Sequence, residues 1–398
     1  MTKKAVIFGG GNIGRGFIGQ LFSESGYEVL FIDVDAALLE TLNQRRQYHL
    51  QIVSNEGAKE LSIGPVRAIN GNDTAAVAKA IAEAEIGATA VGANALKYIV
   101  GNLAAGLTLR AANHAAPINF IICENLHGAA AHIRTLTEGV IDPAGKSYLA
   151  ESVGFVNTVI GRMVPVPTPE MRAEDVSLIR VEAYKELPVD RKGFVGCIPD
   201  ITAMSAYDEF EIFTARKLYI HNCGHALMAY AGYQRGYEFG YEAMADAEVR
   251  NFMLAGLRES AAAICTAFKA DPAWLNAHVD DLMLRFNNRM LGDRIFRLGK
   301  DPMRKLALED RLTGAAKLAD EQGLTPKNLA WGMAEALHFN PADDPAAQKL
   351  QQRIAEAGVE TALLEVSGLQ KDEPLAILVL DAYRQLKQNP RLLPSQLS

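Results

Sequence analysis

Residues Lys217 to His225 (KLYIHNCGH) place an amine, an amide and an imidazole in one short run that can form a helix. At about 100° per residue, Lys217, Asn222 and His225 fall at about 0°, 140° and 80°, so their side chains share one broad helix face. Asn222 and His225 are direct i,i+3 neighbours, whereas about 12 Å along the axis separates Lys217 from His225. These side chains would therefore flank a substrate. A solvated lysine beside two packed or capping polar groups is the alternative.

A glycine-rich turn near the start of the chain has the spacing of a dinucleotide-binding loop. It follows a short strand-type run, Lys4 to Phe8, and precedes a helical stretch. Gly9, Gly11 and Gly14 match the pattern G-x-G-x-x-G. In this pattern the first glycine permits a tight turn, the second lets the backbone approach a pyrophosphate, and the third allows close packing of helix on strand. The order strand, turn, helix predicts a Rossmann-type nucleotide site.

An acidic residue stands where such a site binds ribose. The second strand, Glu28 to Ile32, ends at Asp33, whose carboxylate can accept hydrogen bonds from both hydroxyls of an adenosine ribose. Because this carboxylate would repel a 2′-phosphate, the sequence predicts NAD rather than NADP. A glycine-rich turn beside a solvated aspartate is the alternative, and it leaves the order of strand, turn, helix, strand and acid unexplained.

Strands and helices alternate through the rest of the N-terminal half. Two strands around the turn Asn55-Glu56-Gly57 predict an inserted hairpin. The alternation beyond it predicts an α/β fold with a parallel, doubly wound sheet of the Rossmann type. The predicted strands are 48–54, 60–69, 88–91, 118–123, 152–160 and 176–189, and the predicted helices are 74–85 and 95–110.

Asn125 follows the predicted strand 118–123 directly. It would therefore lie at a carboxyl end of the sheet, the edge at which ligands of such folds bind. An asparagine at this place can instead cap the helix that follows.

The pattern turns helical from about Ala206, with long helical segments near 208–235, 241–270 and 274–290. Alternation typical of strands almost vanishes there. We therefore predict two domains, a Rossmann-type NAD-binding domain at residues 1–195 and a mainly α-helical substrate and catalytic domain at 196–398. The second domain carries Lys217.

A basic cluster lies in the helical half. It consists of Arg294, Arg297, Lys300, Arg304 and Lys305. In a chain with a net charge of −7, a phosphate group is one reason for such a cluster. The alternative is a solvated helix face that is balanced by nearby acids, namely Asp293, Asp301, Glu309 and Asp310.

Composition excludes several classes of function. The chain has 398 residues, 49% of them hydrophobic and 22% charged, as in ordinary globular proteins. The negative net charge argues against binding to nucleic acid, and no apolar span is long enough for a membrane helix. The four cysteines are far apart in sequence, which is typical of free thiols in a reducing compartment. We expect a cytoplasmic monomer or small homo-oligomer that binds a small molecule.

Five stretches resemble motifs of the polyol-specific long-chain dehydrogenases, the mannitol dehydrogenase family. They are FGGGNIGRGFIG at 8–19, TAVGANALK at 89–97, ICENL at 122–126, KLYIHNCGHA at 217–226 and DPMRKLALEDRL at 301–312. The resemblance runs through most of the chain. It implies an NAD-dependent oxidoreductase of the sugar-phosphate branch of this family, with mannitol 1-phosphate and fructose 6-phosphate as the expected substrate pair.

The resemblance also implies roles for individual residues. Lys217 would be the general base, Asn125 and Asn222 would hold the substrate oxygen as it changes between hydroxyl and carbonyl, and His225 would bind and orient the sugar. The remaining matched positions are Gly9, Gly11, Asn12, Ile13, Gly14, Asp33 and Asn94 for the cofactor, and Arg297, Lys300, Arg304 and Lys305 for the substrate. No metal is needed for this chemistry.

A lysine base requires a lowered pKa. An ordinary lysine, with a pKa of about 10.4, is protonated at neutral pH, so catalysis asks for a pKa of Lys217 near roughly 7 to 8. Burial, the positive oxidised nicotinamide and the basic cluster would all lower it.

Two positions depart from the family pattern. Where the family reads F-V-D-x-x-V-D-R, this chain has Asn157 and Gly161 in place of the two aspartates. Two negative charges are therefore missing, which leaves the same chemistry on another sugar-alcohol phosphate, a free polyol or a hexuronate-derived acid as an alternative.

Two other classes of function compete with a lysine-dependent dehydrogenase. His221 and His225, with Cys223 between them, have a spacing that can bind zinc, although Cys223 points away from the histidine face. A non-catalytic NAD-binding sensor would need only the glycine turn. A strong chelator would abolish the activity of a zinc enzyme and leave that of a lysine-dependent dehydrogenase intact. Replacing Lys217 would abolish turnover in the dehydrogenase, whereas a sensor has no turnover to lose.

Overall fold

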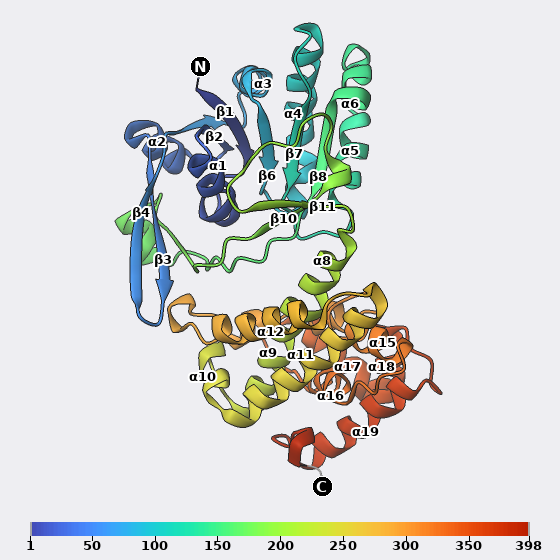
Figure 1. The fold of residues 1–398 in the computed structure, drawn as a ribbon. Helices are drawn as coiled ribbons and strands as arrows, with labels where there is room; N and C mark the ends of the chain where they lie inside the picture. Colours follow the sequence, from blue (N-terminus) through green and yellow to red (C-terminus); the bar gives the residue numbers. More distant parts are fainter. Residues whose placement is uncertain (1, 397–398) are drawn as a thin grey trace. The chain divides into compact units, whose positions relative to one another are not determined.

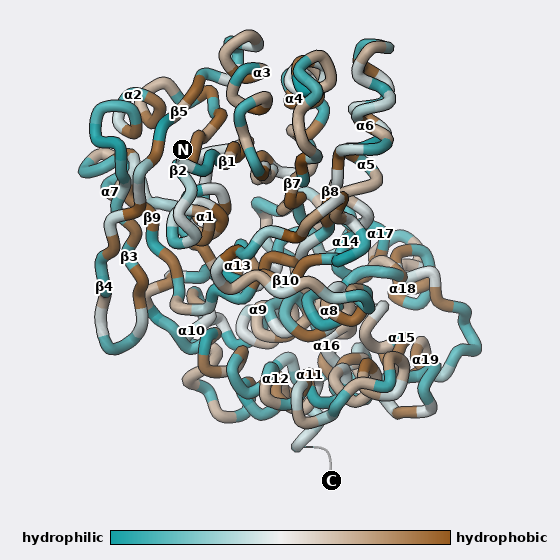
Figure 2. The backbone as a smooth tube through the Cα atoms, turned by 45° about the horizontal axis from the view of Figure 1, so that its top comes forward, coloured by the Kyte–Doolittle hydropathy of each residue, from teal (hydrophilic) through white to brown (hydrophobic). Residues whose placement is uncertain are grey.

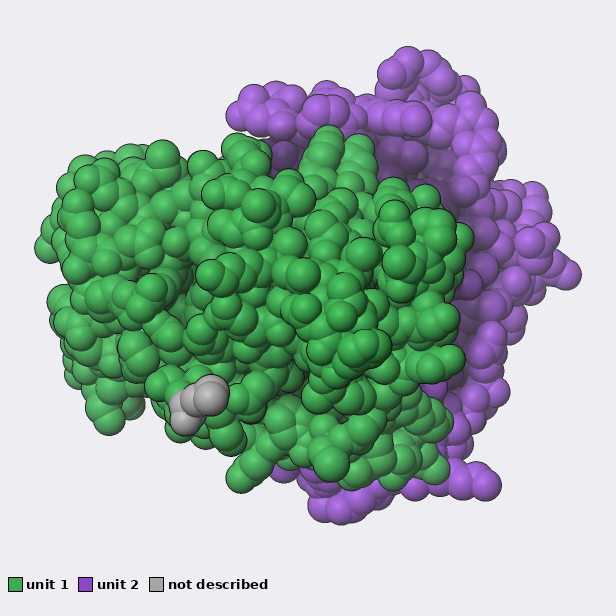
Figure 3. Space-filling view, turned by 90° about the horizontal axis from the view of Figure 1, so that it is seen from above, with its two compact units in different colours: residues 1–210 green, residues 211–398 purple. Residues whose placement is uncertain are grey.

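Two compact units divide the chain, residues 1–210 and 211–398, which Figure 3 colours separately. Of these, the computed structural model describes residues 2–396. The domain boundary predicted at residue 195 lies before strand β11 (Met204–Tyr207), which pairs in parallel with β10 (Leu187–Asp190) of unit 1.

Unit 1 is built on a six-stranded sheet with the order β5-β2-β1-β6-β7-β8. Every neighbouring pair in it is parallel. The strands are β1 (Lys3–Phe8), β2 (Tyr27–Asp33), β5 (Val66–Asn70), β6 (Ile86–Thr89), β7 (Ile118–Ile122) and β8 (Val153–Asn157). This is the order of a dinucleotide-binding sheet with β5 as its third strand. The predicted α/β, doubly wound fold is confirmed.

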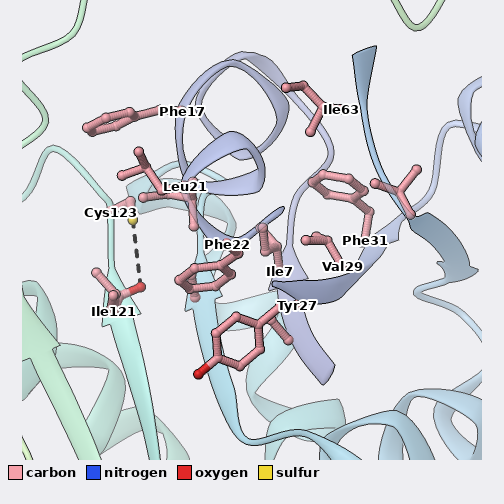
Figure 4. Packing of buried hydrophobic residues seen from close by; sticks show 14 of the residues in the cluster. Ile7, Phe17, Leu21, Phe22, Tyr27, Val29, Phe31, Ile63, Ile121 and Cys123 are labelled. Atoms are coloured by element: carbon pink, nitrogen blue, oxygen red, sulfur yellow. Dashed lines mark hydrogen bonds between the residues drawn. The ribbon is translucent and has the colours of Figure 1, made fainter. Parts of the chain in front are cut away.

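Helices cover both faces of this sheet (Figure 1). The strands are apolar on both sides, as a parallel sheet between two helical layers requires, and β7 is mostly brown in Figure 2. On one face lie the π-helix η1 (Gly14–Gly19), α1 (Gln20–Glu24) and α2 (Ala36–Arg45); on the other lie α3 (Thr74–Glu83), α4 (Leu96–Ala112), α5 (Ala129–Glu138) and α6 (Lys146–Ser152). In the first layer Phe17, Leu21 and Phe22 face Ile7, Val29 and Phe31 of the sheet (Figure 4).

The predicted hairpin exists, with different limits. β3 (Tyr48–Ser54) and β4 (Gly57–Ile63) are antiparallel, and β9 (Ile179–Val181) adds to β3 in parallel. The predicted strand 60–69 is wrong, because Gly64 and Pro65 separate β4 from β5, which joins the main sheet. The predicted strand 176–189 likewise divides into β9 and β10. Proline has no N–H to donate to a ladder, so it marks the break in the first case. The remaining short elements are α7 (Pro169–Glu174), η2 (Ala93–Ala95), η3 (Pro143–Gly145) and η4 (Arg191–Gly193).

Unit 2 is helical, as predicted. Apart from one isolated bridge between Phe239 and Arg294, its described residues form helices, turns and loops. The helices are α8 (Glu211–Ala215), the π-helix η5 (Arg216–Asn222), α9 (Cys223–Arg235), α10 (Gly240–Ala245), α11 (Ala247–Phe268), α12 (Pro272–Phe286), η6 (Arg289–Leu291), α13 (Ile295–Gly299), α14 (Pro302–Lys305), α15 (Thr313–Glu321), α16 (Lys327–Leu337), α17 (Pro345–Ala357), α18 (Val359–Ser367), α19 (Pro374–Gln388) and η7 (Pro394–Gln396).

Helices α9 and α16 form the centre of unit 2. Every residue of α16 from Leu329 to Leu337 is buried, and most of α9 is buried as well. Helix α11 packs against both. A helix that is apolar on all sides must be covered on all sides, so these two helices fix the positions of the elements around them. Within residues 2–396, no helix combines the length and apolar character needed to cross a bilayer.

Candidate active site

In the glycine turn of unit 1, each of the three glycines of the motif has a different structural reason to be glycine. Gly9 has a φ of 95°, and a Cβ there would lie 2.5 Å from the carbonyl oxygen of Ala90. A Cβ on Gly14 would lie 1.9 Å from the carbonyl oxygen of Gly9, so only glycine allows this helix to approach the turn. A Cβ on Gly11 would meet nothing within 4 Å. Gly11 therefore borders open space, where a pyrophosphate fits against the backbone.

Asp33 ties the turn to the second strand. One of its carboxylate oxygens accepts a hydrogen bond from the N–H of Gly10 at 2.6 Å, and the other accepts from Val34 at 2.7 Å and Asp35 at 3.0 Å. The oxygen that accepts from Gly10 has a second lone pair, whereas the other oxygen already accepts two hydrogen bonds. The carboxylate is thus fixed in orientation and can still accept from a hydroxyl. Its position beside the turn fits a ribose.

The helix after the turn begins as a π-helix, which the sequence did not predict. Two side chains from distant segments bond to its backbone: Tyr48 donates to the carbonyl of Arg15 at 2.6 Å, and Arg162 donates to the carbonyl of Gly16 at 3.0 Å. Arg15 itself is 2% exposed and donates to the carbonyl of Val176, but its buried Nε has no hydrogen-bond partner among residues 2–396. Burial lowers the pKa of Arg15. The start of η1 is therefore held from outside the helix.

Glu124 joins the two loops that carry Asn94 and Asn125. Its carboxylate accepts hydrogen bonds from the hydroxyl of Thr89 at 2.5 Å and from the N–H of Val91 at 3.0 Å. Burial raises the pKa of Glu124. Asn94 and Asn125 are both exposed at the carboxyl ends of β6 and β7. Glu124 stands in the ICENL motif, but its sequence alone gave no sign that it bonds to the neighbouring loop.

Asn125 does not cap the helix that follows it. Helix α5 begins after Gly128, and the side chain of Asn157 accepts the N–H of Ala130 at 3.1 Å. Asn157, one of the two departures from the family pattern, therefore provides a hydrogen-bond acceptor for a backbone N–H in the first turn of α5. A Cβ on Gly161, the second departure, would lie 2.8 Å from the ring of Tyr184, so the local packing favours glycine there.

Lys217 and Asn222 lie on the π-helix η5 of unit 2. Its ladder runs from residue i to residue i+5, so these two residues, five apart, stand about one turn from each other. The angles expected for an α-helix do not apply. Ser260 of α11 donates to the carbonyl of Tyr219 inside this turn at 2.6 Å. Asn222 is buried and Lys217 half-buried. An amine and an amide thus project from one widened turn.

Two imidazoles lie beside this turn. The ring centroids of His221 and His225 are 5.0 Å apart, and those of His225 and Phe286 are 4.5 Å apart. Burial, and secondly the charge of Lys217, hold the pKa of both histidines well below its ordinary value. The buried Nδ1 of His221 and Nε2 of His225 have no hydrogen-bond partner within the described chain. The lowered pKa favours the neutral form of both rings.

His278 is a third imidazole near Lys217, and the sequence did not indicate it. Burial lowers its pKa to about 2, with smaller contributions from Arg216, Arg285 and Lys217. It lies on α12, far from the motif in sequence. Among residues 2–396, no three histidine, cysteine or acidic side chains are grouped as a metal site.

The basic cluster does not form one patch of uncompensated charge. Arg294 pairs with Glu238, Arg297 with Asp293, and Arg304 with Asp301 and Asp310. Lys300 is exposed. Lys305 is only 3% exposed and donates to the carbonyl of Lys300. Much of the cluster is therefore a balanced surface, and Lys305 is its buried member.

Known proteins resemble the chain over nearly its whole length. Residues 3–203 match the family model described as the mannitol dehydrogenase Rossmann domain, and residues 209–396 match the mannitol dehydrogenase C-terminal domain. A mannitol-1-phosphate 5-dehydrogenase of Brevibacillus brevis is 38% identical over 96% of this chain and 98% of its own length. One of Bacillus subtilis is 36% identical over 96% of this chain and 100% of its own length.

Solved structures share the fold at low sequence identity. A substrate-free D-sorbitol dehydrogenase has a TM-score of 0.83 at 16% identity, covering 98% of this chain and 94% of its own. A Pseudomonas fluorescens mannitol 2-dehydrogenase, in a ternary complex with NAD and D-mannitol, has a TM-score of 0.72 at 16% identity, covering 98% of this chain and 92% of its own. With both family models matched and relatives aligned almost end to end, the chain belongs to the mannitol dehydrogenase family of oxidoreductases.

Proposed function

We propose that this protein interconverts mannitol 1-phosphate and fructose 6-phosphate with NAD as the hydride carrier. The observation that carries the proposal is the 38% identity to a mannitol-1-phosphate 5-dehydrogenase over 96% of the chain. The Rossmann-type turn with Asp33 beside it supports NAD, and the amine and amide on η5 support proton transfer at a secondary alcohol. The proposal includes the cytoplasmic location that the separated cysteines predict.

The nucleotide would be held by the turn residues Gly9, Gly11 and Gly14, with Asp33 accepting from the ribose hydroxyls. Asn12, Ile13 and Asn94 border the same edge of the sheet as further contacts. Bound there, NAD supplies the acceptor for the hydride that leaves the substrate carbon. The open space beside Gly11 and the unused lone pair on the Asp33 oxygen that accepts from Gly10 fit this group.

The protein must accept the proton of the reacting hydroxyl. In the proposal Lys217 takes it as an uncharged amine, which requires a pKa near roughly 7 to 8. Asn222 would donate an amide hydrogen to the oxygen as negative charge develops on it, and the family resemblance gives Asn125 the same role. Each such donor contributes on the order of 3 kcal/mol in comparable oxyanion sites. His225, whose pKa is held well below its ordinary value mainly by burial, would bind and orient the sugar.

Replacing Lys217 by methionine tests the base. The variant keeps the length of the side chain and removes the amine, so we expect kcat to fall by about 10²- to 10⁴-fold, the range of general base catalysis. NADH binding, measured by the quenching of protein fluorescence, should stay within about 2-fold, because the glycine turn lies in unit 1. A variant that keeps its turnover would contradict the assignment, and so would a protein that binds NADH but turns over no polyol.

The substrate is tested by comparing mannitol 1-phosphate with free mannitol under both NAD and NADP. We expect a kcat/KM at least about 100-fold higher for the phosphate, equivalent to roughly 3 kcal/mol from its charged contacts. Asp33 should disfavour NADP. Equal efficiency with mannitol would instead favour a free polyol, the alternative that Asn157 and Gly161 leave open.

A further inference from the structure

Arg311 is a buried arginine that no predicted role includes. Its residue is 8% exposed, and its Nε donates to the adjacent Asp310 at 2.8 Å. Within residues 2–396, its two terminal nitrogens have no hydrogen-bond partner, and they are not among the fully enclosed unpartnered atoms. They therefore keep contact with solvent while the rest of the side chain is covered.

This arrangement leaves one charge poorly compensated. The exposed arginines of the basic cluster are each paired with carboxylates, and Asp310 is shared between Arg311 and Arg304. A buried guanidinium with unused donors is costly unless a ligand or water supplies acceptors. Its planar pair of N–H groups matches two oxygens of a phosphate.

Lys305 lies beside Arg311 as a second buried cation. Burial, followed by the charges of Arg311 and Arg304, lowers the pKa of Lys305 to about 7. An anion bound at this place would favour the charged form of the lysine, because opposite charges attract more strongly in a poorly solvated site.

The backbone around these two cations is tightly fixed. The N–H of Leu312 bonds to the carbonyl of Lys305 at 3.3 Å, and the hydroxyl of Thr313 bonds to the carbonyl of Leu306 at 2.6 Å. Asp301, with a φ of 62°, donates its N–H to the buried carboxylate of Asp344 at 2.7 Å. The turn between α14 and α15 thus presents Lys305 and Arg311 in a defined geometry.

His225 connects this pair with the base. Burial, and after it the charges of Lys217, Arg297 and Arg311, lower the pKa of His225. A Cβ on Gly314, three residues after Arg311, would lie 2.7 Å from the ring of Tyr219, which stands on η5 between Lys217 and Asn222. The segment that carries Arg311 therefore packs beside the turn that carries Lys217.

We propose that Arg311, with Lys305 beside it, binds the phosphate of the substrate and so selects polyol phosphates over free polyols. This inference rests on the proposed function, and it names the side chains that would make the enzyme specific for phosphorylated substrates. The exposed Arg297, Lys300 and Arg304 would contribute long-range attraction, which solvent and salt weaken.

The test compares Arg311→Gln and Arg311→Lys with the wild type on mannitol 1-phosphate and on mannitol. For Arg311→Gln we expect kcat/KM on the phosphate to fall about 100-fold, mainly through KM, with less than about 3-fold change on mannitol. Arg311→Lys keeps the charge and loses the planar pair of N–H donors, so we expect kcat/KM on the phosphate to fall about 10-fold. Arg304→Gln should have a smaller effect than Arg311→Gln.

Lys317→Gln is the matched control, because it removes one positive charge from the adjacent helix α15, where Lys317 pairs with Glu373. Its kinetics should equal those of the wild type. Equal losses on both substrates in Arg311→Gln, or a larger effect of Arg304→Gln, would overturn the proposal. Circular dichroism and thermal unfolding of Arg311→Lys separate a loss of the anion site from a loss of the fold.

Inorganic phosphate and sulfate serve as probes that do not depend on turnover. Calorimetry should show phosphate binding to the wild type, absent in Arg311→Gln and retained in Lys317→Gln. Phosphate binding that depends on Arg311, without turnover of any polyol phosphate, would uphold the anion site and reject the proposed substrate. Turnover of mannitol 1-phosphate by the wild type, with phosphate binding unchanged in Arg311→Gln, would uphold the proposed substrate and reject Arg311 as the anion site.

Discussion

Glu335 shows at the scale of one residue how burial alone can change a charge. It lies on the central helix α16 with 0% exposure, and neither of its carboxyl oxygens has a hydrogen-bond partner among residues 2–396. Burial raises its pKa to about 8, against a smaller opposing effect of Arg235. Arg235 is itself paired with Asp246 at 3.0 Å. The carboxyl group is therefore protonated in the folded protein at neutral pH.

Replacing Glu335 by glutamine should flatten the dependence of stability on pH. Because the folded protein binds this proton up to about pH 8 and the unfolded chain releases it near pH 4.5, the contribution of Glu335 to stability falls as pH rises between these values, by about 1.4 kcal/mol per unit. Glutamine has no proton to lose. Thermal unfolding should show that the stability of Glu335→Gln relative to the wild type increases from pH 5 to pH 8, because the effect of the histidines is the same in both proteins and cancels. Glu356→Gln, at an exposed site on α17, should behave as the wild type.

At the scale of elements, the two π-helices place the groups that would do the chemistry. η1 follows the glycine turn, and η5 carries Lys217 and Asn222. Such segments are rare and mostly a single turn long, and here side chains of other elements bond to their carbonyls, Arg162 at η1 and Ser260 at η5. Their geometry therefore depends on contacts between elements and not on helix propensity.

Gly14 and Gly11 form a matched pair for testing the start of η1. Gly14→Ala places a methyl group 1.9 Å from the carbonyl oxygen of Gly9, so we expect it to lower the free energy of unfolding by about 1 to 3 kcal/mol and to weaken NADH binding. Gly11→Ala meets no atom within 4 Å, and Gly11 is not among the glycines with positive φ. Gly11→Ala should leave stability unchanged and weaken NADH binding by roughly 10-fold, about 1.4 kcal/mol, because the added methyl group obstructs the pyrophosphate. Urea denaturation and an NADH titration of both variants give the two quantities; an unaltered affinity in Gly11→Ala would contradict the placement of the pyrophosphate.

At the scale of the whole molecule, the buried histidines predict that the stability of unit 2 depends more strongly on acid pH than that of unit 1. Four histidines lie in unit 2, and the pKa of each is lowered, mainly by burial: His221, His225, His278 and His338. In the unfolded chain they take up protons near pH 6.5, whereas in the fold they resist protonation. Their contribution to stability is therefore complete above about pH 6.5 and is lost as pH falls below it.

Acid should accordingly loosen unit 2 before unit 1. Each buried histidine removes about 1.4 kcal/mol per pH unit below pH 6.5 until its folded pKa is reached. Hydrogen exchange between pH 7 and pH 5, corrected for the intrinsic rate, should show the first loss of protection in α9 and α12. His278→Phe should shift this loss to lower pH. Earlier opening of β1 and β2 would show that other groups control the acid response.

The sequence by itself determined the parts of this protein that depend on neighbours along the chain. The run from Lys4 to Asp33 predicts the turn and the start of the parallel sheet, because glycine conformation and strand alternation are local properties. The helical half and its division from the sheet follow from periodicity in the same way. The motifs then led to the family, which the comparisons confirm.

The tertiary structure decided which of the chemically competent residues are charged, buried or already paired. It placed Gly64 and Pro65 between two strands that belong to different sheets, gave Asn157 a role at the start of α5, and paired the arginines of the basic cluster with acids. It also singled out Arg311 and Glu335, which look like ordinary surface residues in the sequence. Desolvation and hydrogen bonding depend on atoms far apart along the chain, and for that reason only the packed molecule fixes them.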